Sequence, residues 1–340
     1  VIIIVEGLND DYIHTYHQFV LMPFLHALQE KSLYWSRCLT VGERSFAALP
    51  SITGSLPYGK EGFTLIDTFP FHYSLFSVLK QNNYFTSYFY TQGSWFDKKD
   101  KYLKYNHVDL ICDKYKFNPK YHKIIVGNDH FFWGYNDKDL FNQSFEVIDT
   151  SKEKKRFDVY YTGTMHPPFA ISDSSFYEKK FKQLTQIMKN DSDKIYLEQN
   201  KQFILTLIFT DDALAQFFEK YKQYPQYKNT LFIITGDHPM SEMPVANCFK
   251  RYHVPLFIYS ENLKTTKKLT NLVSHLDIYS TLLGFLKKYG VKTPEYSTAL
   301  GDNLFTNTQR KFVFMRGDRS MELYSEGYYL SDNQLYIIKN

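Results

Sequence analysis

Two apolar runs of the sequence end in polar side chains that could hold a metal ion. Glu6 follows residues 1–5 (VIIIV), and the pair Asp237-His238 follows the run LFIIT. In an open parallel sheet, ligands bind beyond the carboxyl ends of the strands, so we expect both groups at one edge. Carboxylate and imidazole groups are suitable ligands for Mg²⁺, Mn²⁺ or Zn²⁺. The competing interpretation is that Glu6 caps the next element and Asp237 starts a turn.

Ser45 is the candidate nucleophile. It ends the sequence GERS (residues 42–45) and precedes a stretch of helical character, FAALPSITGSLP. At a helix N-terminus, free N–H groups and the helix dipole favour an anion. Arg44 beside it can bind a phosphate through two hydrogen bonds. A hydroxyl near a metal has a lowered pKa and becomes a nucleophile, although a plain N-cap serine is the commoner role.

Three other residues stand at the ends of predicted elements. His166, in the sequence TMHPPF, follows a predicted strand and could bind a substrate phosphate or protonate a leaving oxygen. A lone loop histidine is more often structural. His275 and Asp277 open a predicted helix (VSHLDIYSTLL), where we expect them to cap the helix or to support the metal ligands from outside.

A sheet is needed to bring these side chains together, and the pattern of apolar runs predicts one. Residues 1–5 are typical of a buried parallel strand. Further strands are predicted at residues 63–66, 84–90, 108–111, 159–161, 231–234 and 254–259, and helices at residues 14–30, 176–189, 195–221 and 272–288. This alternation predicts an α/β fold with a mostly parallel central sheet sandwiched by helices.

The end of the chain has a different pattern. Residues 311–339 contain short alternating runs (FVFMR, MELYS, GYYLS, QLYIIK) separated by turn residues. This pattern predicts a small antiparallel meander attached to the main sheet. We therefore expect a catalytic core at residues 1–310, with C-terminal antiparallel strands at residues 311–340 packed on the same domain.

Composition narrows the class of protein. The 340 residues are 44% hydrophobic and 22% charged, which allows a substantial core. The net charge of +4 is mild, and no Lys/Arg run, KEKKR (152–156) included, has the density of a nucleic-acid footprint. Cys38, Cys112 and Cys248 form no zinc or CxxC pattern. No apolar run approaches the ~18–20 residues of a membrane helix. Because the chain opens inside a strand-like run, we expect sequence upstream of it.

Taken in order, these fragments resemble the sulfatase-like branch of the alkaline-phosphatase superfamily, and most closely the lipoteichoic acid synthase and phosphoglycerol transferase family. The resemblance covers most of the chain, from the strand before Glu6 through GERS, TMHPPF and TGDH to PLFIYS and HLDIYSTLL. It implies that Glu6, Asp237 and His238 bind one divalent metal, with Mn²⁺ as first choice and Mg²⁺ or Zn²⁺ as alternatives. It also implies that Ser45 is the covalent nucleophile and a further metal ligand.

The same resemblance implies the remaining roles. His166 matches a substrate-binding histidine, and Arg44 takes the place of a basic residue flanking the nucleophile. The implied reaction moves a phosphoglycerol or phosphoethanolamine group from a phospholipid to an envelope glycan or lipid. The implied location is the outer side of the cytoplasmic membrane, with upstream membrane helices as the anchor. Nucleic acid is not among the expected partners.

The sequence departs from the family pattern in three ways. The nucleophile is Ser45, where lipoteichoic acid synthases usually have threonine. A second substrate histidine, expected near residues 90–93 (YTQG), is absent, which leaves the glycerol-phosphate specificity open. The sulfatase motif C-x-P/A-x-R is also absent, because Cys38 is followed by LTVG, so formylglycine chemistry is not expected.

Two rival functions follow from the same residues. The first is a phosphodiesterase or phosphomonoesterase with two metals, for which Asp211, Asp212, His253 and His275 are the candidate extra ligands. The second is a non-catalytic protein of envelope assembly. The complete set of nucleophile and metal ligands argues against this second rival.

Overall fold

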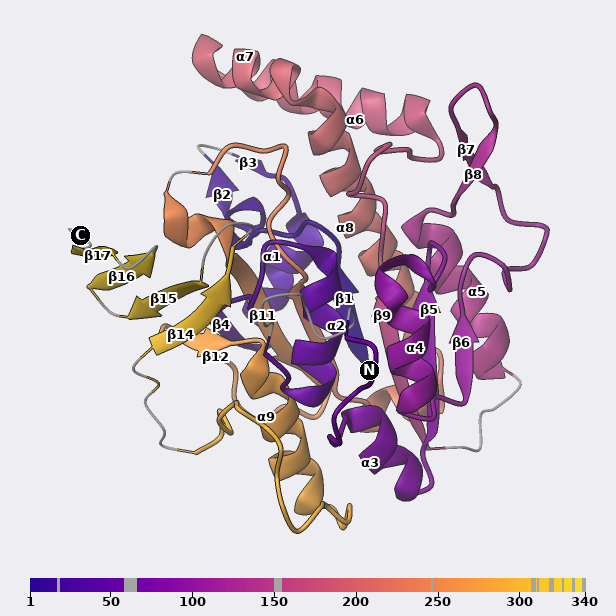
Figure 1. Cartoon of the computed structure of the whole chain (residues 1–340). Helices are drawn as coiled ribbons and strands as arrows, with labels where there is room; N and C mark the ends of the chain where they lie inside the picture. Colours follow the sequence, from indigo (N-terminus) through magenta and orange to yellow (C-terminus); the bar gives the residue numbers. More distant parts are fainter. Residues whose placement is uncertain are drawn as a thin grey trace.

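A nine-stranded mixed sheet forms the centre of the molecule (Figure 1). The computed structural model describes residues 1–16, 19–57, 66–149, 155–245, 247–306, 310, 312–317, 321–325, 327–331 and 334–337. The strands run in the order β12 (Lys267–Leu269), β4 (Leu33–Leu39), β11 (His253–Tyr259), β10 (Phe232–Gly236), β1 (Ile2–Val5), β9 (Arg156–Tyr161), β5 (Phe85–Tyr90) and β6 (Leu110–Cys112), and β13 (Val273–Ser274) pairs with β4. Only β11 runs antiparallel to its neighbours within this sheet. The mostly parallel sheet predicted from the sequence is confirmed.

Helices cover both faces of this sheet. They are α1 (Pro23–Gln29), α2 (Ser45–Gly54), α3 (Leu75–Gln81), α4 (Lys99–Tyr105), α5 (Asp137–Asp149), α6 (Ser174–Ile187), α7 (Asp191–Gln199), α8 (Lys201–Tyr221) and α9 (Leu276–Lys287). Short 3₁₀ helices lie at η1 (Asp10–Ile13), η3 (Phe96–Lys98), η4 (Pro225–Asn229) and η5 (Cys248–Arg251). One face of the sheet packs on α1, α5, α6 and α8, and the other packs on α2, α3, α4 and α9.

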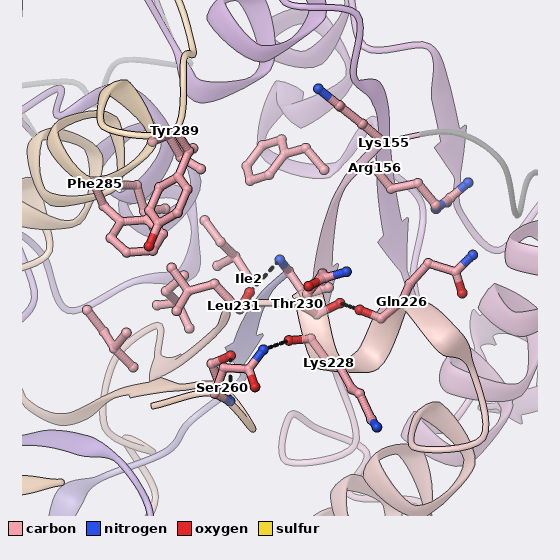
Figure 2. A pocket seen from close by; sticks show the side chains of 18 of the residues that line it. Ile2, Lys155, Arg156, Gln226, Lys228, Thr230, Leu231, Ser260, Phe285 and Tyr289 are labelled. Atoms are coloured by element: carbon pink, nitrogen blue, oxygen red, sulfur yellow. Dashed lines mark hydrogen bonds between the residues drawn. The ribbon is translucent and has the colours of Figure 1, made fainter. Parts of the chain in front are cut away.

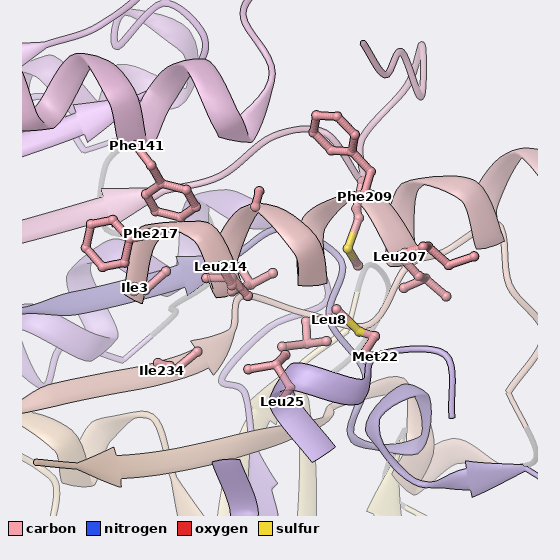
Figure 3. Close-up of a cluster of buried hydrophobic side chains, with 14 of the residues drawn as sticks. Ile3, Leu8, Met22, Leu25, Phe141, Leu207, Phe209, Leu214, Phe217 and Ile234 are labelled. Atoms are coloured by element: carbon pink, nitrogen blue, oxygen red, sulfur yellow. The ribbon is translucent and has the colours of Figure 1, made fainter. Parts of the chain in front are cut away.

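Strand β1 lies between the two apolar cores. Ile3 joins the core formed with α1, α5 and α8, where Figure 3 shows it near Phe217 and Ile234. Ile2 and Ile4 join the other core, formed with α2 and α9. Because successive side chains of a strand point to opposite faces, a strand that is covered on both faces needs an unbroken apolar run. This explains why VIIIV carries no polar residue until Glu6.

Three predicted elements differ from the structure. Residues 14–30 do not form one helix: they contain β2 (Thr15–Tyr16), β3 (Phe19–Val20) and then α1, which begins at Pro23. Proline is favoured in the first turn of a helix and disfavoured inside one, so a helix cannot run through this position without cost. The predicted helix at 195–221 is divided at Asn200 into α7 and α8, and the one at 272–288 begins with β13. In the predicted strand 63–66, residues 63–65 lie outside the described residues and Ile66 lies in a bend.

The C-terminal strands form a sheet of their own. β14 (Phe312–Arg316), β15 (Met321–Ser325), β16 (Tyr328–Ser331) and β17 (Gln334–Ile337) pair antiparallel in chain order. The predicted meander is therefore present, but it is not an extension of the main sheet. The backbone N–H of Arg316 donates to the carbonyl of Val41 over 2.8 Å, and an apolar cluster that includes Val313, Tyr252 and Leu39 joins the two sheets.

Within the described ranges, no helix combines the length and apolar character that crossing a lipid bilayer requires.

Candidate active site

Two carboxylates meet where β1 and β10 end side by side. Glu6 directly follows β1 and Asp237 directly follows β10, and the two strands pair in parallel register up to Val5 and Gly236. The N–H of Gly7 donates to Asp237 Oδ1 over 2.8 Å, and the N–H of Asp237 donates to the Val5 carbonyl over 3.1 Å. These bonds hold both acidic side chains at the carboxyl edge of the sheet. The sequence prediction that parallel strand ends would converge here is confirmed.

His238 completes this group with a fixed tautomer. Its Nδ1 lies 2.9 Å from the carbonyl oxygen of Pro239, which can only accept, so Nδ1 carries the proton. The lone pair of Nε2 therefore points into the site. It lies 3.3 Å from Asp237 Oδ2 and 3.5 Å from Glu6 Oε1. A histidine held through one nitrogen and presenting the other is the usual arrangement of a metal ligand.

Ser45 lies against the same three side chains. Its Oγ is 3.1 Å from His238 Nε2 and 3.3 Å from Glu6 Oε2. Ser45 is the first residue of α2, and Arg44 before it occupies the N-cap position with extended backbone. The plain N-cap role is therefore wrong for Ser45, and its hydroxyl is aimed at the acidic group at the positive end of the helix dipole.

The buried carboxylates of this group favour a bound cation. Glu6 and Asp237 are 3% and 1% exposed, and single ligand atoms of Glu6, Asp237 and His238 lie within 4.8 Å of one another. Burial, and secondarily the neighbouring Asp237, raise the pKa of Glu6 well above its usual value. Two buried carboxylates at this spacing repel each other unless a positive charge lies between them. Oxygen and nitrogen donors in this number fit one divalent ion, with the Ser45 oxygen as a further ligand.

Two further residues lie next to this group: Tyr161, which the sequence did not single out, and His275, which we expected to cap a helix or to support the metal ligands. The hydroxyl of Tyr161, at the end of β9, lies 2.7 Å from Asp237 Oδ2 and 3.0 Å from the Ser45 carbonyl, and it donates between them. His275 is fully buried beside Thr235, and its Nε2 lies 3.2 Å from Thr235 Oγ1. Burial lowers the pKa of His275 to about 4, so the ring is neutral at physiological pH. Tyr161 thus connects Asp237 to the backbone of Ser45.

A buried lysine also faces this region. The side chain of Lys99 is 0% exposed, and its ammonium lies 2.8 Å from Asp97 and within 5.2–5.6 Å of the ring centres of Tyr90, Phe96 and Tyr161. The contact with Tyr161, whose hydroxyl donates to Asp237, brings this ammonium close to the carboxylates. Its charge lowers the pKa of Glu6, in opposition to burial. The signal in the sequence was DKKDK, a charged run at residues 97–101 soon after a strand.

His166 lies at the same edge of the sheet, in the loop after β9. Its Nδ1 lies 2.9 Å from the carbonyl oxygen of Pro167, which leaves Nε2 for a ligand, and its ring packs 5.3 Å from that of Trp133. The loop is anchored by the buried Asp137, whose Oδ1 accepts the N–H groups of Gly163 (2.9 Å) and Thr164 (3.1 Å). No contact between His166 and Ser45 or the metal ligands is recorded among the described residues, so its role in binding substrate stays a prediction.

The remaining candidates are not members of this group of three ligands. The Arg44 side chain is exposed at the start of α2. Asp211 accepts the N–H groups of Phe24 (2.8 Å) and Leu25 (3.0 Å) at the start of α1, and Asp212 lies 3.1 Å from the ammonium of Lys138. Neither aspartate supplies a second metal site beside Ser45.

Two further candidates have structural partners. Asp277 is buried, accepts the N–H of Ser274 over 2.8 Å and pairs with Arg310, so it holds the start of α9 as expected. His253 joins Asp10 and Asp11 in a second acidic group, but the ammonium of Lys250 already bridges Asp11 and His253. A lysine in that position supplies the positive charge that a metal would bring.

A family model described as Sulfatase matches residues 1–288. The chain belongs to the sulfatase family. Enzymes of this family and of the wider alkaline-phosphatase superfamily depend on divalent metals, which agrees with the donor set around Glu6. Two curated proteins of Bacillus subtilis (strain 168) are similar: "Lipoteichoic acid synthase-like YvgJ", 24% identical over 189 residues, and "Lipoteichoic acid synthase 2", 21% identical over 259 residues. The matches cover 56% and 71% of this sulfatase-family chain but only 26% and 36% of those proteins.

Solved structures show the same fold. An alkaline phosphatase superfamily protein from Vibrio parahaemolyticus superposes with a TM-score of 0.76 at 21% identity, over 98% of this chain and 77% of that one. The lipoteichoic acid synthase LtaP from Listeria monocytogenes also gives 0.76, at 18% identity, over 99% and 81%. The phosphonate monoester hydrolase SpPMH from Silicibacter pomeroyi gives 0.64 at 14% identity, over 98% and 86%. The predicted family and fold are therefore confirmed.

A cavity of about 730 Å³ lies at the opposite edge of the sheet (Figure 2). Ile2 and Leu231, at the amino ends of β1 and β10, are among its lining residues, together with Phe285 and Tyr289 at the end of α9. None of the candidate metal ligands lines it. The cavity is therefore separate from the candidate metal site.

Proposed function

We propose that this chain is a metal-dependent transferase that moves a phosphoglycerol or phosphoethanolamine group from a phospholipid to a glycan or lipid of the cell envelope, through a covalent Ser45 intermediate. The observation that carries the proposal is the position of Ser45 Oγ, 3.1 Å from His238 Nε2 and 3.3 Å from Glu6 Oε2, at a helix N-terminus. The named activities of the relatives make phosphorus chemistry the first choice. Under this proposal the domain works at the outer face of the cell membrane.

The residues that would hold the metal are Glu6, Asp237, His238 and the Ser45 oxygen. A bound divalent ion, with Mn²⁺ as first choice, would polarise a phosphoryl oxygen and lower the pKa of the serine hydroxyl. Tyr161 fixes Asp237 and the Ser45 backbone in one arrangement through its shared hydrogen bond. The site is therefore organised before substrate arrives, which is the main source of electrostatic catalysis.

In the first step, Ser45 Oγ gives its proton to solvent water and attacks phosphorus in line. The bond from phosphorus to the diacylglycerol oxygen breaks, and that oxygen takes up a proton, for which His166 is the candidate donor. The ammonium of Lys99 and the guanidinium of Arg44 would balance charge on the phosphoryl oxygens. In the second step, His166 takes the proton of an acceptor hydroxyl, whose oxygen attacks the same phosphorus, and Ser45 Oγ leaves and takes up a proton from water.

Hydrolysis is the second candidate, because water in place of the acceptor turns the same cycle into phosphodiester cleavage. The similarity in fold to a phosphonate monoester hydrolase keeps this alternative open. The donor set argues for one metal, since the described residues near Ser45 include a single group of three ligands. A non-catalytic role is less well supported, because nucleophile and ligands are assembled together.

The test measures metal content and turnover of a fluorescent phosphatidylglycerol, with Mn²⁺ added and then removed. We expect about one metal per chain, turnover that needs it, and complete loss in Ser45→Ala. The matched control is Ser51→Ala, the same change further along α2, where the hydroxyl donates to the Ala48 carbonyl (3.0 Å). Turnover that survives in Ser45→Ala would refute the covalent mechanism. Product analysis separates a transferred head group from a hydrolysed one.

A further inference from the structure

Exposed apolar side chains project from the edge of the molecule that carries the site. The first group lies around the hairpin of β7 (Ile124–Val126) and β8 (Phe131–Gly134), which extends beyond the carboxyl edge of the sheet in Figure 1. Tyr115, Ile125 and Phe131 are 44–64% exposed there. The loop before the hairpin contacts the segment that follows β5, where Trp95 Nε1 donates to the Tyr115 hydroxyl over 3.3 Å. Large apolar side chains at such positions mark interaction surfaces.

A second group lies on the helices α6 and α7, which Figure 1 shows projecting from the same end of the molecule. Phe176, Ile187 and Ile195 are 50–56% exposed on them. We call these three residues, with Tyr115, Ile125 and Phe131, the rim. The loop of His166 connects β9 to α6, so this second part of the rim follows directly on a candidate substrate contact.

Positive charge accompanies the rim. Lys116 and Lys123 are exposed beside the first group, and Lys179, Lys182 and Lys189 are exposed on α6 and directly after it. Apolar side chains combined with lysines are the composition of a surface that lies on anionic lipid.

We propose that the rim docks on the surface of an anionic lipid bilayer and that the carboxyl edge of the sheet, with Ser45, faces the head groups. This inference deepens the proposed function and rests on it for the identity of a lipid donor, because it names the surface by which such a donor reaches the nucleophile. Binding to lipid is separable from turnover. It requires only the rim and its lysines.

A bilayer fits the rim better than a glycan does. Sugars bind to flat aromatic faces flanked by hydrogen-bonding groups, whereas Ile125, Ile187 and Ile195 are aliphatic and project from three separate elements. Side chains of this kind gain free energy by entering the boundary between head groups and acyl chains. The geometry therefore points to lipid, and glycan binding is left as an outcome of the test.

The test is co-sedimentation of the purified chain with vesicles of phosphatidylglycerol and phosphatidylcholine in equal parts. Two triple variants remove the rim: Tyr115→Ser with Ile125→Ser and Phe131→Ser, and Phe176→Ser with Ile187→Ser and Ile195→Ser. The matched control, Tyr289→Ser with Tyr296→Ser and Leu300→Ser, removes side chains that are at least as exposed, in the segment after α9. Circular dichroism and thermal unfolding establish that each variant folds.

We expect each rim variant to lose on the order of tenfold or more in partition to vesicles, and the control to retain wild-type binding. Wild-type binding should weaken as NaCl rises from ~0.1 to ~0.5 M, because salt screens the lysines. Vesicle binding by Ser45→Ala at the wild-type level separates docking from the proposed reaction. The inference is overturned if the wild type does not sediment with vesicles or if the control loses as much as the rim variants. It is also overturned if the rim variants lose affinity only for a soluble glycan.

Discussion

The change Tyr161→Phe removes one oxygen atom from the centre of the site. The phenol hydroxyl shares its proton between two acceptors, Asp237 Oδ2 (2.7 Å) and the Ser45 carbonyl (3.0 Å). The residue is fully buried, so water has no route to replace the hydroxyl. A hydrogen bond to a charged group contributes about 1.5–3 kcal/mol. Since about 1.4 kcal/mol corresponds to a tenfold change in an equilibrium constant, metal affinity should fall by about ten- to a hundredfold. This is also the range for losing a group that orients a metal ligand.

The assay titrates metal-free protein with Mn²⁺ and measures the binding affinity by calorimetry. Tyr88→Phe is the matched control, because Tyr88 is also fully buried, in the adjacent strand β5, and its hydroxyl has no hydrogen-bond partner within the described part of the chain. Its metal affinity should equal that of the wild type. If Tyr161→Phe binds Mn²⁺ as tightly as Tyr88→Phe does, Asp237 does not need the phenol. The reasoning that connects Tyr161 to the metal then fails.

Three other changes test separate parts of the site. Lys99→Met keeps the volume and removes the charge near Glu6, so turnover should fall on the order of a hundredfold while Mn²⁺ binds at least as tightly; weaker metal binding in the variant would contradict this. Asp137→Ala removes the acceptor that holds the His166 loop, so buried N–H donors lose their partner. The free energy of unfolding, measured with urea, should fall by about 2–4 kcal/mol. A loss below about 0.5 kcal/mol would show that the loop does not depend on Asp137. The folded pKa of His275, about 4, lies below its unfolded value of about 6.5, so the unfolded state takes up the proton first and stability is lost as pH falls between these values. The loss amounts to up to about 3 kcal/mol, and His275→Gln should show a correspondingly smaller loss over this range in thermal unfolding.

The positions of Glu6, Asp237 and Ser45 could be predicted because each stands directly after or before a strong local pattern. Glu6 ends an unbroken apolar run, and Asp237 ends another, so the rule for parallel sheets was enough to bring them together. Ser45 was recognisable from the helical pattern that follows it. The boundary between an N-cap and a first helical residue is not visible in the sequence, and only the backbone of Arg44 shows which one Ser45 is.

The supporting residues could not be predicted in this way. Tyr161 reads as one more aromatic residue in a core strand, and its role depends on where its hydroxyl ends, which no spacing rule gives. Lys99 belongs to a charged run that resembles a solvated surface, yet the side chain is buried among aromatic rings. The strand β4 was also missed. Its sequence LYWSRCL has polar residues at its middle, so it lacks the unbroken apolar run by which the other inner strands were predicted.

The reversed direction of β11 has a mechanical consequence. Because β11 runs antiparallel to β10, it begins at the edge of the sheet where β10 ends, so Asp237 and His253 lie at the same edge. Near the end of this segment, Arg251 lies 2.7 Å from Glu43, two residues before the nucleophile, and 2.9 Å from Glu322 of the C-terminal sheet. The small sheet therefore stabilises, through Arg251, the position of the segment that leads to Ser45. Removing the chain from β14 onward would remove Glu322 from this pair of contacts without removing any candidate metal ligand.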